Sequence, residues 1–434
     1  MEICYDTRVH LSIEFVDYNR YEVTQVAQSD AYIYATYRVV DKPNQLQARA
    51  DGIAIGLTVG SWTDLPQSKQ DSVRQHCGIV ASIEEVDAGA RPDGTVTADI
   101  TIGYPVINFT PTFAALLTTV FGKLSMDGLI KLVGLQIPEP FARAFPGPKF
   151  GVNGIRDRLK VYNRPLLMSI FKSCIGNNLD ELTAHFTEQA LGGADLIKDD
   201  EIFFTEAYAT PEARVEAYTK AMERTRRETG KDVLYAVNLT GPVFELRDRA
   251  RRLSDLGAGA LLLNVFAYGL DVLRELAADP DIQVPIMAHP AVSGALYAAP
   301  QHGIAADILL GQLLRLGGAD IVIYPSPYGS VTLERTVGQQ LVSALRTPGP
   351  HNVCLPAPSA GIHPGLVPIL LQDMGVDFIV NAGGGIHGHP DGATAGGQAF
   401  TAAIDAALAG VPLAEAANHS EPLRKALLRW GEAK

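Results

Sequence analysis

From about residue 164 to the C-terminus the chain repeats one pattern eight times, and this repeat limits the folds that it can adopt. Each cycle contains a short apolar run, a polar or Gly/Pro-rich break and a longer helical stretch. Eight such cycles predict a (β/α)8 TIM barrel, because a doubly wound sheet usually stops at about five to seven strands. The runs expected to form the barrel strands are residues 166–171, 194–197, 233–239, 260–266, 284–288, 319–324, 352–357 and 377–380.

A second domain is expected before the barrel, since 434 residues exceed what one barrel needs. Residues 31–39, 78–86 and 95–103 are strand-like, with helical patterns between them. We therefore predict a ferredoxin-like α+β domain over residues 1–145, built around one open sheet, and a barrel domain over residues 146–434. The boundary is expected in a segment that contains Pro138, Pro140, Pro146, Gly147 and Pro148.

Composition excludes several classes of function. The net charge is −12 and lysine and arginine are not clustered, so no nucleic-acid partner is expected. Residues 1–16 mix charged and apolar positions, and no later stretch stays apolar for about 18 residues, so we expect a cytoplasmic protein with no membrane partner. The four cysteines lack metal-binding spacing, which favours reduced structural thiols; they are Cys4, Cys77, Cys174 and Cys354.

The decapeptide at residues 192–201 combines an apolar run with Lys198, Asp200 and Glu201. Because strand side chains alternate between faces, Lys198 and Asp200 project the same way, and a turn can bring Glu201 beside them. Mg²⁺ prefers hard oxygen ligands, and a buried neutral lysine can add CO₂ to become a carbamate that presents such oxygens. The alternative is that these acidic residues cap the following helix.

Two glycine-rich breaks follow the last two predicted strands, at residues 358–361 and 381–385. Backbone amides at these strand ends form the usual phosphate cradle of a TIM barrel. The predicted phosphate-binding residues are Ser359, Gly361, Gly383 and Gly384. The alternative is that the glycines only permit tight turns.

Two further residues at strand ends are candidates for catalysis. His289 ends the fifth predicted strand, where a neutral imidazole could exchange a proton near the metal. Lys172 follows the first strand, and we expect it to face the phosphate or a developing oxyanion. His387 and His389 lie in a His-Gly-His-Pro sequence, for which a turn stabilised by side-chain hydrogen bonds is favoured over a metal site.

Several motifs give the chain a family resemblance. They are Gly-Ser-Trp-Thr at 60–63, residues 113–122, Pro-Gly-Pro-Lys-Phe-Gly at 146–151, Lys172, the decapeptide, His289, Ser359 and the glycines at 383–385. The chain resembles the RuBisCO large-chain superfamily and, within it, the form IV RuBisCO-like proteins. The resemblance implies a carbamate on Lys198, formed with activating CO₂, that binds Mg²⁺ together with Asp200 and Glu201. It also implies a homodimer in which the N-terminal domain of one subunit completes the active site of the other.

Departures from the carboxylase pattern argue against CO₂ fixation. The loop after strand six reads Tyr-Pro-Ser-Pro-Tyr-Gly-Ser at 324–330 and lacks the lysine of true carboxylases. Three other family positions have also changed, to Gly56, Thr119 and Cys174. What remains implies a Mg²⁺-dependent enzyme that forms an enediolate from a small phosphorylated keto-sugar or keto-acid.

Two reactions share this enediolate. The sequences of residues 116–123, 289–294 and 325–330 most resemble those of the methionine-salvage enolases that act on 2,3-diketo-5-methylthiopentyl 1-phosphate. In those enolases the catalytic base lies at the position of Lys123. Without that match, Lys123 is equally well a surface lysine. The long N-terminal segment and the Ala/Leu/Gly-rich composition favour instead a decarboxylase of 3-oxo-isoapionate 4-phosphate in sugar-acid catabolism, with the enolase as the alternative. A binding or regulatory protein without activity is the third hypothesis.

Overall fold

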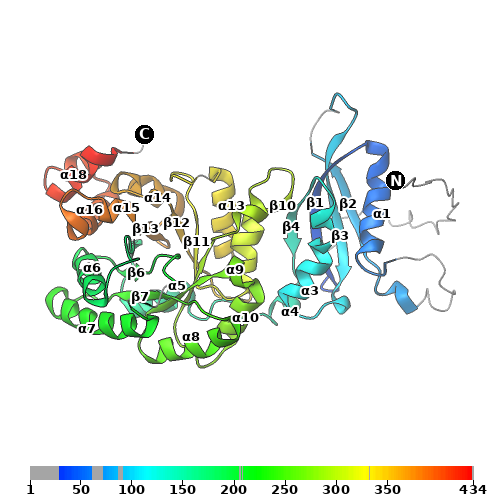
Figure 1. Cartoon of the computed structure of the whole chain (residues 1–434). Helices are drawn as coiled ribbons and strands as arrows, with labels where there is room; N and C mark the ends of the chain where they lie inside the picture. The colour runs from blue at the N-terminus through cyan, green and yellow to red at the C-terminus, as the bar shows by residue number, and fades with distance from the viewer. Residues whose placement is uncertain are drawn as a thin grey trace, which may run out of the picture.

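A computed structural model describes residues 29–60, 72–86, 91–204, 207, 209–331 and 333–432. Residues 61–63 of the Gly-Ser-Trp-Thr motif at 60–63 and Cys4 lie outside these residues. The chain forms two bodies, an open sheet with helices near the N-terminus and a barrel over the remainder (Figure 1). Within the described ranges, every helix is too short or too polar to cross a membrane.

The N-terminal sheet has the order β10-β4-β1-β3-β2. β1 pairs antiparallel with both β3 and β4, and β2 pairs antiparallel with β3, which is the split βαβ arrangement of a ferredoxin-like domain. The predicted fold class is thereby confirmed, and β1, β2 and β3 match the three predicted strands. The elements are β1 (Tyr32–Asp41), α1 (Leu46–Gly56), β2 (Ile79–Glu85), β3 (Val96–Pro105), α3 (Phe113–Leu117), the π-helix η4 (Thr118–Gly122), η5 (Leu124–Met126) and β4 (Ile130–Gln136).

One strand of this sheet comes from the barrel half of the chain. β10 (Gly303–Ile304) pairs parallel with the edge strand β4. The His302 ring lies 2.8 Å from the Gly128 carbonyl oxygen, and Lys131 Nζ donates to the Tyr297 and Ala299 carbonyls. The segment that follows the fifth barrel strand is therefore joined to the N-terminal domain by hydrogen bonds.

Eight parallel strands form the second sheet, in the order β12-β11-β9-β8-β7-β6-β5-β13. β12 and β13 lie in contact, so the sheet curls into a nearly closed barrel. All eight predicted strands are present; they are β5 (Leu166–Ile170), β6 (Leu196–Lys198), β7 (Leu234–Asn238), β8 (Ala260–Asn264), β9 (Ile286–His289), β11 (Ile321–Pro325), β12 (Leu355–Ser359) and β13 (Ile379–Ala382).

Helices follow the strands and cover the outside of the barrel (Figure 1). The longer ones are α6 (Leu179–Leu191), α7 (Pro211–Thr229), α8 (Leu246–Asp255), α10 (Leu270–Ala278), α13 (Arg335–Arg346), α14 (Val367–Met374), α16 (Gly392–Leu408) and α18 (Glu421–Trp430). The helix α5 (Gly151–Leu159) precedes the first barrel strand and packs against the apolar cluster inside the barrel. The short helices of the barrel half are η6 (Val243–Glu245), α9 (Val265–Tyr268), α11 (Gly294–Tyr297), η7 (Asp307–Gln312), α12 (Leu313–Leu316), η8 (Pro364–Leu366), α15 (Gly384–His387) and α17 (Leu413–Ala416), and those before it are η2 (Pro43–Gln45), η3 (Val106–Asn108) and α4 (Glu139–Ala142).

The inward-facing side of the barrel strands changes from apolar to polar near their carboxyl ends. Residues such as Leu196, Ala236 and Leu262 belong to one apolar cluster inside the barrel. Because side chains alternate along a strand, the inward residue two positions later lies nearer the mouth of the barrel. These later residues are Lys198, Asn238, Asn264, His289 and Asn381, so polar groups collect at the mouth where TIM-barrel enzymes carry their chemistry.

At the opposite end of the barrel, a buried carboxylate links separate backbone segments by hydrogen bonds. Asp320, just before β11, accepts hydrogen bonds from the backbone N–H groups of Phe150, Gly151 and Ile286 at 2.7, 2.8 and 3.0 Å. It therefore joins the start of α5 to the start of β9. Asp195 has a similar position before β6, where it accepts from the Leu167 N–H at 2.8 Å.

Replacing Asp320 with alanine leaves three backbone N–H groups without an acceptor, and an unpaired buried group costs about 1–3 kcal/mol. We expect Asp320→Ala to lower the free energy of unfolding by about 3 kcal/mol or more, measured by urea titration. Asp255→Ala, at the exposed end of α8, is the control and should change it by less than about 0.5 kcal/mol. Equal unfolding midpoints for the two variants would contradict the role assigned to Asp320.

Candidate active site

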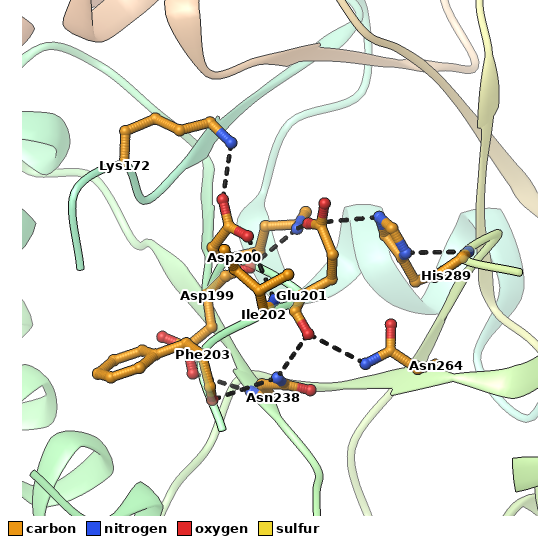
Figure 2. A network of polar contacts seen from close by, with 11 residues as sticks. Lys172, Asp199, Asp200, Glu201, Ile202, Phe203, Asn238, Asn264 and His289 are labelled. Atoms are coloured by element: carbon orange, nitrogen blue, oxygen red, sulfur yellow. Dashed lines mark hydrogen bonds and ion pairs between the residues drawn. The ribbon is translucent and has the colours of Figure 1, made fainter. Parts of the chain in front are cut away.

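The decapeptide ends β6 at the mouth of the barrel and places its charged side chains on two sides of the strand (Figure 2). Lys198, Asp200 and Glu201 lie at the mouth, near Lys172 and His289. Asp199 points the other way, toward α7. The structure thus brings five of the predicted site residues together.

Lys198 is buried, with 1% of its surface exposed. Its Nζ donates to the Asp199 carbonyl oxygen at 2.8 Å and lies 3.4 Å from Glu201 Oε2. Burial lowers the pKa of Lys198, although the neighbouring carboxylates oppose this shift. A lowered pKa favours the neutral amine, which is the form that reacts with CO₂.

Asp200 and Glu201 each contact a nitrogen-bearing side chain. Lys172 Nζ donates to Asp200 Oδ2 at 2.7 Å, and His289 Nε2 lies 3.4 Å from Glu201 Oε2. Burial alone would raise the pKa of the Glu201 carboxyl, but the neighbouring Lys198, His289 and Lys172 and a backbone hydrogen bond together lower that pKa to about 2. Glu201 is therefore a carboxylate that can bind a cation.

His289 is a neutral imidazole in a defined tautomer. Burial and the charge of Lys198 lower the pKa of His289 to about 4. Its Nδ1 accepts a hydrogen bond from the Ala291 N–H at 3.2 Å, so the ring proton is on Nε2, the atom that faces Glu201. At neutral pH this ring can donate a hydrogen bond through Nε2–H but cannot accept one at that atom.

Two asparagines hold the main chain at Glu201. Asn264 Nδ2 donates to the Glu201 carbonyl oxygen at 3.2 Å and Asn238 Nδ2 donates to the same atom at 3.3 Å (Figure 2). The Oδ1 atoms of both residues are buried and have no protein partner. Sequence reasoning could not show that these two amides converge on one carbonyl.

Asp199 anchors the strand from its outer face. It accepts from Arg214 Nη2 at 2.9 Å, from the Tyr235 hydroxyl at 2.7 Å and from the Asn238 N–H at 2.9 Å. Asp199 and Arg214 are both almost completely buried. The ion pair fixes the end of β6 against α7, and sequence reasoning did not identify it.

The donor set at the mouth fits Mg²⁺ only if Lys198 contributes oxygens. Within the described residues, no group of three or more His, Cys, Asp and Glu side chains is gathered so that it could hold a metal ion. Asp200 and Glu201 supply two hard carboxylates, and the buried Lys198, with its lowered pKa, is suited to supply a third as a carbamate. The unpaired Asn238 and Asn264 oxygens leave further acceptors nearby.

The glycine-rich segments lie beside this group. A Cβ at Gly383 would be only 2.8 Å from Lys172 Cε, so the missing side chain lets Lys172 pass across the end of β13. Gly361 has a φ of +80°, and its neighbour Ala360 accepts a hydrogen bond from the Ser330 N–H. The Ser359 carbonyl accepts from the Ser326 N–H, while nothing packs closely where a Cβ on Gly384 would lie. Lys172 thus connects the carboxylates to one predicted phosphate cradle.

Other predicted residues lie away from the mouth. Lys123 is exposed after η4 in the N-terminal domain, and no hydrogen bond or ion pair described for the mouth residues involves it. His389 is structural, since its Nε2 lies 2.9 Å from the Pro422 carbonyl and its Nδ1 accepts from the Asp391 N–H. Cys174 and Cys354 are buried free thiols, and burial raises the pKa of Cys174 to about 11.

Comparison with known proteins gives a consistent result. The family model for the ribulose bisphosphate carboxylase large chain, catalytic domain, matches residues 151–430. A 2,3-diketo-5-methylthiopentyl-1-phosphate enolase from Geobacillus kaustophilus is 53% identical over 405 residues, 92% of this chain and 98% of the relative. One with the same name from Exiguobacterium sibiricum is 51% identical and covers 93% and 100%.

Solved structures agree with the fold. A rubisco-like protein (MtnW) from Alicyclobacillus acidocaldarius is 62% identical, with a TM-score of 0.89 over 92% of this chain and all of the other. The octameric ribulose-1,5-bisphosphate carboxylase/oxygenase from Pyrococcus horikoshii is 29% identical, with a TM-score of 0.85 over 94% and 95%.

Substitution of two adjacent aspartates is expected to affect different properties, stability for Asp199 and turnover for Asp200. Asp199→Ala leaves the Arg214 charge buried without its partner and should lower the free energy of unfolding by about 3–5 kcal/mol. Asp200→Ala removes a contact with a half-exposed lysine and should change it by less than about 1 kcal/mol, while abolishing turnover. Urea titration and an activity assay on both variants separate the two roles; a large stability loss in Asp200→Ala would contradict the assignment.

Proposed function

Because the chain belongs to the family of the ribulose bisphosphate carboxylase large chain, we propose that it is an enolase acting on 2,3-diketo-5-methylthiopentyl 1-phosphate. The observation that carries this proposal is the match of about half of all positions across almost the whole length of relatives with that name. The gathered lysines, carboxylates and histidine at the mouth of the barrel support an active enzyme over a binding protein.

The comparisons favour the enolase over the sugar-acid decarboxylase that the sequence analysis preferred. That preference depended on the length of the N-terminal segment and on overall composition, and neither feature lies at the reacting centre. Both reactions pass through an enediolate, so the two differ in whether a proton or CO₂ leaves the substrate.

In this proposal Asp200, Glu201 and a carbamate on Lys198 hold Mg²⁺. Bound there, Mg²⁺ would act as a Lewis acid that stabilises negative charge developing on a substrate carbonyl oxygen. Asn238 and Asn264 keep Glu201 in place through its main-chain carbonyl. His289 keeps a hydrogen-bond donor, its Nε2–H, directed at the same carboxylate.

The substrate phosphate would bind the glycine-rich ends of β12 and β13, through Ser359, Gly361, Gly383 and Gly384. Lys172 supports this placement, because its side chain runs from Gly383 to Asp200. The substrate name puts the phosphate on the carbon next to the first carbonyl. A lysine that spans cradle and carboxylates is therefore placed to contact both the phosphate and the adjacent oxygen.

Lys123 would act as the base from the partner subunit. It is exposed in the single subunit, so its amine is open to contact by a partner. The Tyr37 hydroxyl donates to the Val120 carbonyl and so fixes the chain just before Lys123. A covering partner is also supported by exposed apolar side chains on the loops at the barrel mouth, which are Ile175, Ile202, Phe204, Val243, Phe244 and Val292.

The two reactions are separated by incubating the enzyme with Mg²⁺, bicarbonate and each substrate. The enolase should convert the diketone phosphate and incorporate deuterium from heavy water without releasing CO₂. Release of CO₂ from 3-oxo-isoapionate 4-phosphate would instead establish the decarboxylase. Absence of both reactions would favour the binding protein.

The same assay tests the lysine carbamate. Lys198→Ala should lower kcat by about 10³-fold or more, because the metal's stabilisation of the transition state is worth several kcal/mol. Activity of the unaltered enzyme should also depend on preincubation with bicarbonate. Lys220→Ala, an exposed lysine on α7, is the control and should leave kcat unchanged. Full turnover by Lys198→Ala would exclude the carbamate.

Sharing of the active site between subunits is tested by mixing two inactive variants. Lys123→Ala and Lys198→Ala should each be inactive alone, but a mixed dimer contains one site with both lysines intact. Random reassociation should therefore restore about one quarter of the original activity. If the mixture stays inactive although mixed dimers form, the partner does not supply Lys123.

A further inference from the structure

The C-terminal helix α18 contacts both loops that carry the proposed phosphate site. Loop 7 comprises residues 360–366, after β12, and loop 8 comprises residues 383–391, after β13. We propose that Trp430, the last residue of α18, is a positioning residue that holds these two loops together and thereby sets the affinity for the substrate phosphate. The inference rests on the proposed function, because it takes both loops to bind phosphate.

Loops 7 and 8 lie against each other through their backbones. A Cβ at Gly385 would be 2.3 Å from the Ile362 carbonyl oxygen and 3.1 Å from His363 Cα. This close approach fixes the distance between the two glycine-rich segments. A cradle of backbone amides binds an anion well only when its N–H groups point at the same place, so that spacing determines the affinity.

Trp430 packs on loop 7. Its ring stacks with the His363 ring at a centroid distance of 6.3 Å and an interplanar angle of 17°. The chain just beyond α18 is equally close, since a Cβ at Gly365 would lie 2.0 Å from the Gly431 carbonyl oxygen. The C-terminal end of α18 therefore restricts the position of loop 7.

The same helix also contacts loop 8. A Cβ at Gly388 would lie 3.4 Å from Trp430 Cζ2, so the ring is against this loop as well. His389 Nε2 donates to the Pro422 carbonyl at 2.9 Å, and Lys425 Nζ pairs with Asp391 at 2.7 Å. Trp430 is thus in contact with both loops, while the two polar contacts hold α18 on loop 8 alone.

A shared core ties these contacts together. Leu423 of α18 is buried in one cluster with Ile362 of loop 7 and Ile386 of loop 8. In Figure 1, α18 lies beside α16, the long helix that follows β13. Removing the Trp430 ring would leave this core in place but free the facing sides of loops 7 and 8 to separate.

The test compares Trp430→Ala, Trp430→Phe and His363→Ala with the unaltered enzyme. Trp430→Ala should raise KM for the phosphorylated substrate and the inhibition constant of inorganic phosphate by the same factor, about tenfold, with kcat within about twofold. His363→Ala removes the stacking partner and should act in the same direction. Trp430→Phe keeps an aromatic ring and should restore most of the affinity. Leu428→Ala, 75% exposed on the same helix, is the control and should change nothing.

Direct titration with inorganic phosphate by calorimetry makes the result independent of turnover. If Trp430→Ala unfolds at lower urea but binds phosphate like the unaltered enzyme, α18 is only structural and the inference is wrong. If kcat falls while KM and phosphate affinity stay unchanged, the inference is also wrong. Failure of the unaltered enzyme itself to bind phosphate would overturn the proposed phosphate site as well, which distinguishes that failure from the first two.

Discussion

The alternation of side chains across residues 198–200 is the constraint on which the active site depends. A strand must send Lys198 and Asp200 to one face and Asp199 to the other. The outward carboxylate meets a buried arginine on α7, and the inward lysine is left in a pocket that disfavours its charge. The anchor and the lysine proposed to form the carbamate are therefore adjacent residues, so the strand cannot shift by one position without losing both.

Much of this architecture could be predicted from the sequence, because local patterns specify it. The eight apolar runs marked every barrel strand, and three of the N-terminal strands were equally clear. β4 was missed because it carries Gly134 and a register shift against β1 at Thr36 and Tyr37. β10 has only two residues, too few to show any periodicity.

The residues of the candidate site also fall into those that the sequence could predict and those that it could not. Lys198, Asp200 and Glu201 are neighbours in sequence, so their grouping followed from one decapeptide. Arg214 and Asn264 reach the decapeptide from 15 and 63 residues away, and a single sequence carries no signal for such pairs. Lys123 shows a different limit, because a residue proposed to serve a second subunit has no local partner that a pattern or one folded chain could display.

Because β10 comes from the barrel half of the chain but pairs with the N-terminal sheet, it affects whether the two halves can be produced as separate fragments. A fragment that stops near residue 145 would contain β4 without β10, and the outer edge of β4 would present unpaired N–H and C=O groups to solvent. Such an edge pairs readily with other chains, so the fragment would tend to aggregate even though its own sheet is otherwise complete. The two halves are separate in shape. A chimera that contains the N-terminal half alone would nevertheless need another element to cover the edge of β4 that β10 now pairs with.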